Sequence, residues 1–172
     1  EWLKQFCGYH AIPLLIEADG SRQKPLKAWT DHEPPIPEFV DMVVQMIGLS
    51  GLGKPLMDEF VHRADIFSKL SGLGNGEIIS PEAIARVLTH LEGGLKNIPQ
   101  KARRVVLLNQ ADTPELQSSA QAMTAPLLSI YQSVIIASLS NEIIYAVHEP
   151  IAGIILAAGE STRFGSPKQL LD

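Results

Sequence analysis

The chain alternates between continuous apolar runs and segments with the spacing of amphipathic helices. Apolar runs predict strands at residues 12–16, 40–47, 103–108, 132–139 and 142–148, and a further strand begins at residue 151. The run from Ile12 to Ile16 is continuous rather than alternating, which is typical of strands in a parallel sheet that is covered on both faces. We therefore expect strands that lie inside the molecule rather than at its surface.

Helical patterns separate the later strands. Residues 81–94 and 113–131 each begin with a capping residue followed by proline, Ser80-Pro81 and Thr113-Pro114. Gly93-Gly94 is expected to end the first of these helices, and residues 56–67 are a weaker candidate for the start of another. Residues 22–39 carry four prolines and predict a loop. Strands that alternate with helices predict an α/β fold with a mostly parallel sheet flanked by helices.

Composition narrows the class of protein. The chain has 172 residues, is 45% apolar and 19% charged, and has a net charge of −5, which argues against nucleic acid as a partner. The single cysteine, Cys7, cannot form an internal disulfide, which favours a reducing cytoplasm. The longest apolar run, IAGIILAAG, is too short to cross a membrane.

The two ends of the sequence predict a piece of a longer protein. The chain begins with Glu1 rather than methionine, and it stops shortly after a strong motif near its carboxyl end. We expect further residues on both sides.

The segment GLSGLGKP resembles the start of a phosphate-binding loop. Gly48, Gly53 and Lys54 fit the pattern G-x-x-x-x-G-K, but Pro55 stands where the motif needs serine or threonine to bind magnesium. Proline also lacks a backbone N–H for the phosphates. We favour a glycine-rich turn after a strand over a working loop, with Lys54 as a candidate anion contact.

Polar residues follow two of the apolar runs, where ligands bind in open α/β sheets. The segment LLIEADGS ends in Glu17, Asp19 and Gly20, and a carboxylate such as Asp19 at a strand end is a typical Mg²⁺ ligand. Solvated acids that end a strand are the alternative. The neighbouring SRQKPLK cluster, with Arg22, Lys24 and Lys27, has the size for a small anion.

The segment NQAD resembles the N-K-x-D signature of GTP-binding proteins. Asp112 would accept hydrogen bonds from guanine, Asn109 would tie neighbouring loops together, and Gln110 replaces the usual lysine. A simple strand-to-helix turn capped by Asp112 and Thr113 explains the same residues equally well.

Four segments in order resemble the YqeC family over residues 1–148: LLIEADGSRQKPLKAWTDHEPPIP, VVQMIGLSGLGKPL, VHR and VVLLNQAD. The resemblance implies a P-loop-NTPase-like accessory domain for selenium-dependent molybdenum hydroxylases, with its phosphate loop ahead of residue 1. Glu17 and Asp19 would then be catalytic, Asp19 would bind Mg²⁺, and Gly20, Asn109 and Asp112 would bind the nucleotide, expected to be GTP. The family motifs also include candidate substrate or anion contacts: Arg22, Lys24, Lys27, His32, Lys54, His62 and Arg63.

The segment GIILAAGESTRFGSPKQLL resembles the opening of MobA-like nucleotidyltransferases, which include molybdenum cofactor cytidylyltransferases. The resemblance implies that Ala157, Gly159, Arg163 and Lys168 contact an NTP, expected to be CTP. We therefore expect an accessory domain at residues 1–150 and the start of a second domain at residues 151–172. Twenty-two residues cannot build that second domain alone, so it would be inactive in this chain.

Together these resemblances predict part of a protein that matures molybdenum hydroxylases. Its expected partners are a nucleotide, a molybdopterin-type cofactor and a hydroxylase apo-enzyme, with no nucleic acid and no membrane. The alternative is a non-catalytic module that binds the cofactor or a partner through an NTPase-like fold. A stand-alone GTPase that has lost its first residues is a third reading.

Overall fold

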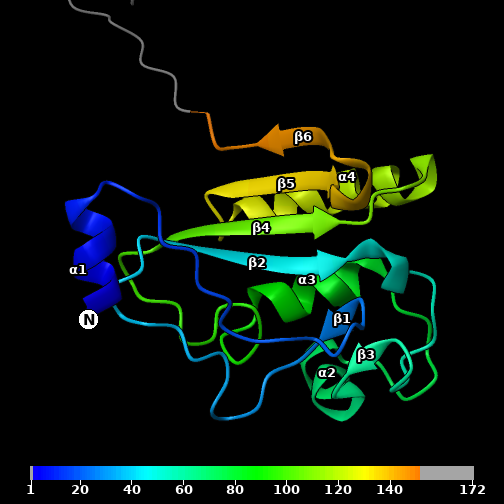
Figure 1. The fold of residues 1–172 in the computed structure, drawn as a ribbon. Helices are drawn as coiled ribbons and strands as arrows, with labels where there is room; N and C mark the ends of the chain where they lie inside the picture. The colour runs from blue at the N-terminus through cyan, green and yellow to red at the C-terminus, as the bar shows by residue number, and fades with distance from the viewer. Residues whose placement is uncertain (1, 152–172) are drawn as a thin grey trace, which may run out of the picture.

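The computed structural model describes residues 2–151, which form an α/β fold around a four-stranded sheet (Figure 1). The strand order is β2-β4-β5-β6, with β2 at Met42–Gly48, β4 at Arg103–Asn109, β5 at Ser133–Ser138 and β6 at Ile143–His148. β2, β4 and β5 run parallel, and β6 is antiparallel to β5. The predicted strands in these four regions and the mostly parallel sheet are confirmed.

The predicted residues of the second domain lie outside the described part of the chain. Ala157, Gly159, Arg163 and Lys168 all fall in residues 152–172. Their roles stay predictions.

Two helices pack on one face of the sheet, as Figure 1 shows. α3 (Pro81–Thr89) begins after Ser80, whose side chain accepts a hydrogen bond from Ala83 N, and α4 (Pro114–Leu128) begins after Thr113 in the same way. Both predicted helix starts are correct. Both helices are shorter than predicted, and α3 ends before Gly93-Gly94 because His90 already has extended backbone angles.

The remaining elements lie on the β2 side of the sheet or beyond its end. β1 (Leu26–Lys27) and β3 (Val61–His62) form a small parallel pair, and α2 (Ala64–Ser71) follows directly. The predicted helix at 56–67 is wrong over its first half, because Arg63 has left-handed backbone angles and α2 starts only after it. α1 (Trp2–Tyr9) was not predicted, and none of its residues is buried. Short 3₁₀ turns, η1 (Leu49–Gly51) and η2 (Leu139–Asn141), follow β2 and β5.

The core lies between the sheet and α3 and α4. It takes every second residue of the central strands, including Val106, Leu108, Val134 and Ile136. The intervening residues point to the opposite face, where the strand register aligns a row of apolar side chains: Met46, Leu107, Ile135 and Val147. The two ends of this row, Met46 and Val147, are 57% and 56% exposed.

The strand predicted at residues 12–16 is absent. Residues 12–20 have no regular structure, and Leu15 is 92% exposed. An apolar run forms a strand only where a neighbouring strand supplies hydrogen-bond partners. No described segment supplies them here, because β2 is the edge strand on this side and does not pair with residues 12–16.

Candidate functional site

The carboxyl ends of β2, β4 and β5 meet at one edge of the sheet, and Asn109 connects two of them. Asn109 is the last residue of β4, and its Oδ1 accepts a hydrogen bond from Leu139 N, 3.0 Å away, in the turn after β5. Its side chain therefore ties neighbouring loops together, as expected for the asparagine of the N-K-x-D signature.

Asp112 lies at the same edge and is exposed. Its Oδ1 accepts a hydrogen bond from Ser138 Oγ, and Asn141 Nδ2 donates to the same hydroxyl at 2.7 Å. Sequence reasoning missed the segment 138–141. Its serines directly after an apolar run were the signal that could have marked it.

Gln110 joins the end of β4 to the end of β2. Its backbone is left-handed, and its Oε1 accepts a hydrogen bond from Ser50 Oγ at 2.6 Å. The same oxygen would lie 2.2 Å from a side chain added at Gly48, so any larger residue there would have to displace the Gln110 side chain. Gln110 therefore holds η1 in place.

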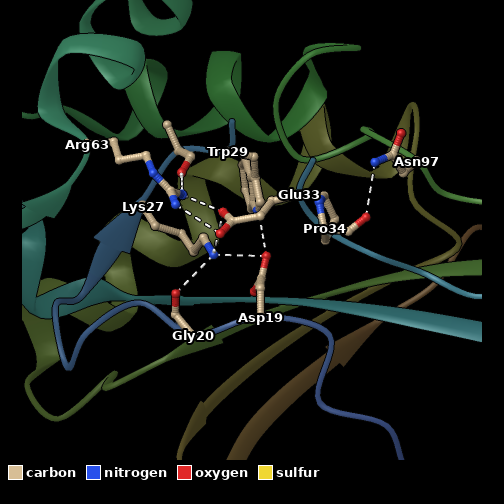
Figure 2. Close-up of polar contacts among 9 residues, drawn as sticks. Asp19, Gly20, Lys27, Trp29, Glu33, Pro34, Arg63 and Asn97 are labelled. Carbon is tan, nitrogen blue, oxygen red and sulfur yellow. Dashed lines mark hydrogen bonds and ion pairs between the residues drawn. The ribbon is translucent and has the colours of Figure 1, made fainter. Parts of the chain in front are cut away.

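Asp19 lies in a polar cluster beside the sheet (Figure 2). Its Oδ2 is 2.8 Å from Lys27 Nζ and accepts a hydrogen bond from Trp29 Nε1 at 2.7 Å. Lys27 also donates to the carbonyl oxygen of Gly20 at 3.0 Å. These contacts fold residues 19–29 back on themselves. Trp29, which sequence reasoning left out, is buried and fixes the carboxylate.

Glu33 and Arg63 extend this cluster toward α2. Arg63 binds the Glu33 carboxylate through both terminal nitrogens and also donates to Ala28 O at 3.0 Å (Figure 2). The hydrogen bond from Arg63 holds the pKa of Glu33 below its ordinary value of 4.5, against an opposing effect of burial. The same hydrogen bond raises the pKa of Arg63. Glu33 was not among the predicted site residues.

His62 lies next to this ion pair within a group of positive charges. Burial lowers its pKa below 6.5, and the nearby charges of Arg63, Arg22, Lys27 and Lys24 lower it further. Lys24 itself donates to the carbonyl oxygens of Asp58 and Val61. Three of the predicted anion contacts, Lys24, Lys27 and Arg63, thus bind groups of the protein.

The glycine-rich loop after β2 directs its backbone N–H groups inward. Leu52 N donates to Leu49 O at 2.9 Å, Gly53 N to Ile79 O at 3.0 Å and Lys54 N to Gly51 O at 3.4 Å. The ammonium group of Lys54 lies 5.7 Å from the centre of the Phe60 ring. In this folded turn the N–H groups of residues 52–54 are therefore already used.

A cavity of about 520 Å³ lies between the segment after α1 and β2. It brings together several predicted site residues: Glu17, Asp19, Gly20, Lys24, Lys27 and Asn109. Met42, Val44 and Met46 of β2 are among its apolar lining residues. The remaining predicted residues of the described chain lie outside it: Arg22, His32, Lys54, His62, Arg63 and Asp112.

Asp19, the expected magnesium ligand, has one of its two carboxylate oxygens engaged within the protein. Oδ2 of Asp19 is already engaged by Lys27 and Trp29, and Glu17 is exposed on the other side of Ala18. Within residues 2–151, no group of three histidine, cysteine, aspartate or glutamate side chains is placed to hold a metal ion. Nor does any helix in that range have the length and apolar character to cross a membrane.

Comparisons with known proteins point to one family. The family model described as YqeC protein matches residues 1–65. A protein of Escherichia coli (strain K12) named "Uncharacterized protein YqeC" is 36% identical over 114 residues, which cover 66% of this chain and 44% of that protein. The chain thus spans less than half the length of this curated relative. No solved structure matches. Both matches support the YqeC family for this chain.

Proposed function

We propose that this chain is part of a nucleotide-binding accessory protein that acts in the maturation of molybdenum hydroxylases. The observation that carries the nucleotide proposal is the pair Asn109 and Asp112, which join the end of β4 to the turn after β5. Ligands of open α/β sheets bind at this carboxyl edge.

Asp112 supports guanine as the base. Ser138 and Asn141 hold one carboxylate oxygen in place, and among the described residues the second oxygen has no hydrogen-bond donor. A fixed, exposed carboxylate accepts hydrogen bonds from the N1–H and 2-amino groups of guanine. Adenine lacks this pair of donors at the same edge, so the site would favour GTP over ATP.

The link to molybdenum rests on the two family resemblances. In a longer protein, the MobA-like segment that begins near residue 151 would supply CTP-dependent transfer of a nucleotide to a molybdopterin-type cofactor. The accessory domain would then act on the same cofactor or on a hydroxylase apo-enzyme.

A non-catalytic binding module is the second candidate function. The N–H groups of residues 52–54 favour it, because they bond within the protein and are not available to phosphates. The engagement of Asp19 Oδ2 by Lys27 and Trp29 favours it as well, because Lys27 already supplies a positive charge to this carboxylate. Such a module would bind a nucleotide or cofactor without hydrolysing it.

Calorimetric titration with GTP, ATP and CTP tests the proposal. It compares this chain with a form extended at its amino end by the implied phosphate loop. We expect the extended form to bind GTP at least about tenfold more tightly than ATP, and Asp112→Ala to remove this preference. Asp31→Ala, which changes an exposed aspartate away from β4, is the matched control. Equal affinity for all three nucleotides would contradict the guanine site, and GTP binding without hydrolysis would support the second candidate.

A further inference from the structure

The outer edge of β2 presents unpaired backbone groups to the cavity. At the end of the strand, Gly48 N donates to Pro25 O at 2.8 Å, so the N–H of Gly48 points away from β4. The direction of the N–H alternates along a strand, so those of Met42, Val44 and Met46 point to the same outer edge. Among the described residues, these three groups have no backbone partner.

Apolar side chains line both sides of this edge. Met42, Val44 and Met46 are each about half exposed, and Ile16 lines the cavity opposite them and is also exposed. Ile12 and Leu15, which precede Ile16 in the same apolar run, are exposed as well. Figure 1 shows the segment after α1 running past β2 without joining the sheet. An apolar strand edge of this kind is normally paired or covered.

We propose that this cavity accepts one extended, apolar polypeptide strand, supplied by a longer form of the same polypeptide and running parallel to β2. Backbone N–H and C=O groups spaced along a strand recognise another backbone. The cavity volume would also suit a small molecule, but such a ligand would leave most of these groups unpaired. The same polypeptide is the favoured source because the curated relative is more than twice as long as the region that matches.

We take the parallel direction from β4 and β5, because β2 already pairs in parallel on its other side and only the far edge strand β6 is antiparallel. β2, β4 and β5 are parallel and joined through α3 and α4, which cover one face. A parallel strand inserted beside β2 would be connected to its next strand on the side away from β4. Because such connections are right-handed, this crossover would lie on the face of the sheet opposite α3 and α4. That face carries the apolar row of Met46, Leu107, Ile135 and Val147, whose two end residues are exposed.

Strand insertion also explains the exposed run at residues 12–16. An inserted strand has two edges, one for β2 and one for residues 12–16. The segment predicted as a strand would gain its missing partner, and the sheet would continue across the cavity.

The test adds such a strand to the complete chain. A valine-rich segment as long as β2, seven residues, is fused to the amino end through a glycine-serine linker of about 12 residues, which reaches roughly 20 Å. Hydrogen exchange is measured at Met42, Val44 and Met46. We expect exchange at these amides to slow by about tenfold or more. The control fusion has proline at alternate positions of the added strand, which removes its donors.

Two variants locate the acceptor edge. Met46→Glu places a charge beside the cavity, and Val147→Glu places one at the other edge of the sheet. Met46 and Val147 are exposed to nearly the same extent. We expect only Met46→Glu to abolish the protection. The proposal would be overturned if Val147→Glu, and not Met46→Glu, abolished the protection, or if the proline control showed equal protection.

Sedimentation of the unfused chain tests the source of the strand. We expect a monomer whose β2 amides exchange rapidly. A dimer with these amides already protected would make a second copy the occupant and overturn the proposal. None of these measurements involves a nucleotide, so they fail or succeed independently of the proposed guanine site.

Discussion

At the scale of single residues, the loop from Asp19 to Glu33 is held by charge pairs that run from the cavity to α2. Asp19 binds Lys27, and Glu33 binds Arg63, which also reaches the carbonyl of Ala28. Sequence reasoning identified three of these four charged residues but assigned them to a ligand. It missed Glu33 because a carboxylate in a proline-rich loop has no distinctive spacing, and its partner lies 30 residues away.

Arg63→Lys tests whether this network stabilises the fold. Lysine keeps the charge but cannot bind a carboxylate through two parallel hydrogen bonds and also reach Ala28. Because the pair is partly exposed, we expect the free energy of unfolding to fall by about 1 kcal/mol, measured by urea denaturation. Arg86→Lys, on the exposed side of α3, is the control. An equal effect of the two variants would contradict a structural role for Arg63.

The pH dependence of stability is expected to reflect His62. Its pKa is lowered below 6.5 in the folded protein, so the unfolded chain takes up a proton first as the pH falls. The contribution of neutral His62 to the free energy of unfolding is therefore fully present above the pKa of this residue in the unfolded chain. It is lost as the pH falls below that value. Glu33, whose pKa is also lowered in the folded protein, adds a further loss of stability as the pH falls below about 4.5.

We expect His62→Gln to flatten the stability profile between about pH 7 and 5, measured by urea denaturation across that range. His10→Gln, which changes an exposed histidine after α1, should leave the slope unchanged. A slope that survives in His62→Gln would show that another group carries it.

At the scale of elements, α3 and α4 are joined through a buried tyrosine. Tyr131 follows α4, and its hydroxyl donates to Leu88 O in α3 at 2.8 Å. Burial raises the pKa of Tyr131, so the hydroxyl stays protonated and remains a donor. We expect Tyr131→Phe to lower the free energy of unfolding by about 1–2 kcal/mol, because the carbonyl of Leu88 is left buried and unpaired.

Tyr145→Phe in β6 is the matched control for this prediction, since Tyr145 is exposed. Thermal unfolding of the two variants makes the comparison. The bond between the helices would be unimportant if both variants unfolded at the same temperature.

The elements that were predicted correctly are stabilised either by their own residues or by pairing with one another. Ser80 and Thr113 cap their own helices, and the apolar runs of β2, β4 and β5 pair with one another. Residues 12–16 carry the same apolar pattern but form no strand, because a strand depends on a neighbour that the described residues lack. The two-residue strands β1 and β3 are too short to leave any pattern.

At the scale of the whole molecule, the sheet is covered on one face and open on the other. The candidate site was only partly predictable from the sequence. Asn109 and Asp112 could be located from the ends of the apolar runs, whereas the cavity beside β2 could not. Its walls come from residues 16–29, residues 34–40, β2 and the end of β4, and only the fold brings them together. The amino-acid pattern alone says that a run is apolar, not that its partner is absent.

The open face predicts that this chain binds hydrophobic dyes in its native state. Met46 and Val147 lie at the two ends of the apolar row, so the double variant Met46→Lys/Val147→Lys should reduce the fluorescence of bound anilinonaphthalene sulfonate. Both residues are more than half exposed, so we expect stability to change by no more than about 0.5 kcal/mol. Leu91→Lys is the control, because Leu91 is 75% exposed but lies outside the sheet. If Leu91→Lys reduced the fluorescence as much, the dye would be reporting scattered apolar groups. A loss confined to the double variant would instead mark the open face of the sheet as the apolar surface that binds the dye.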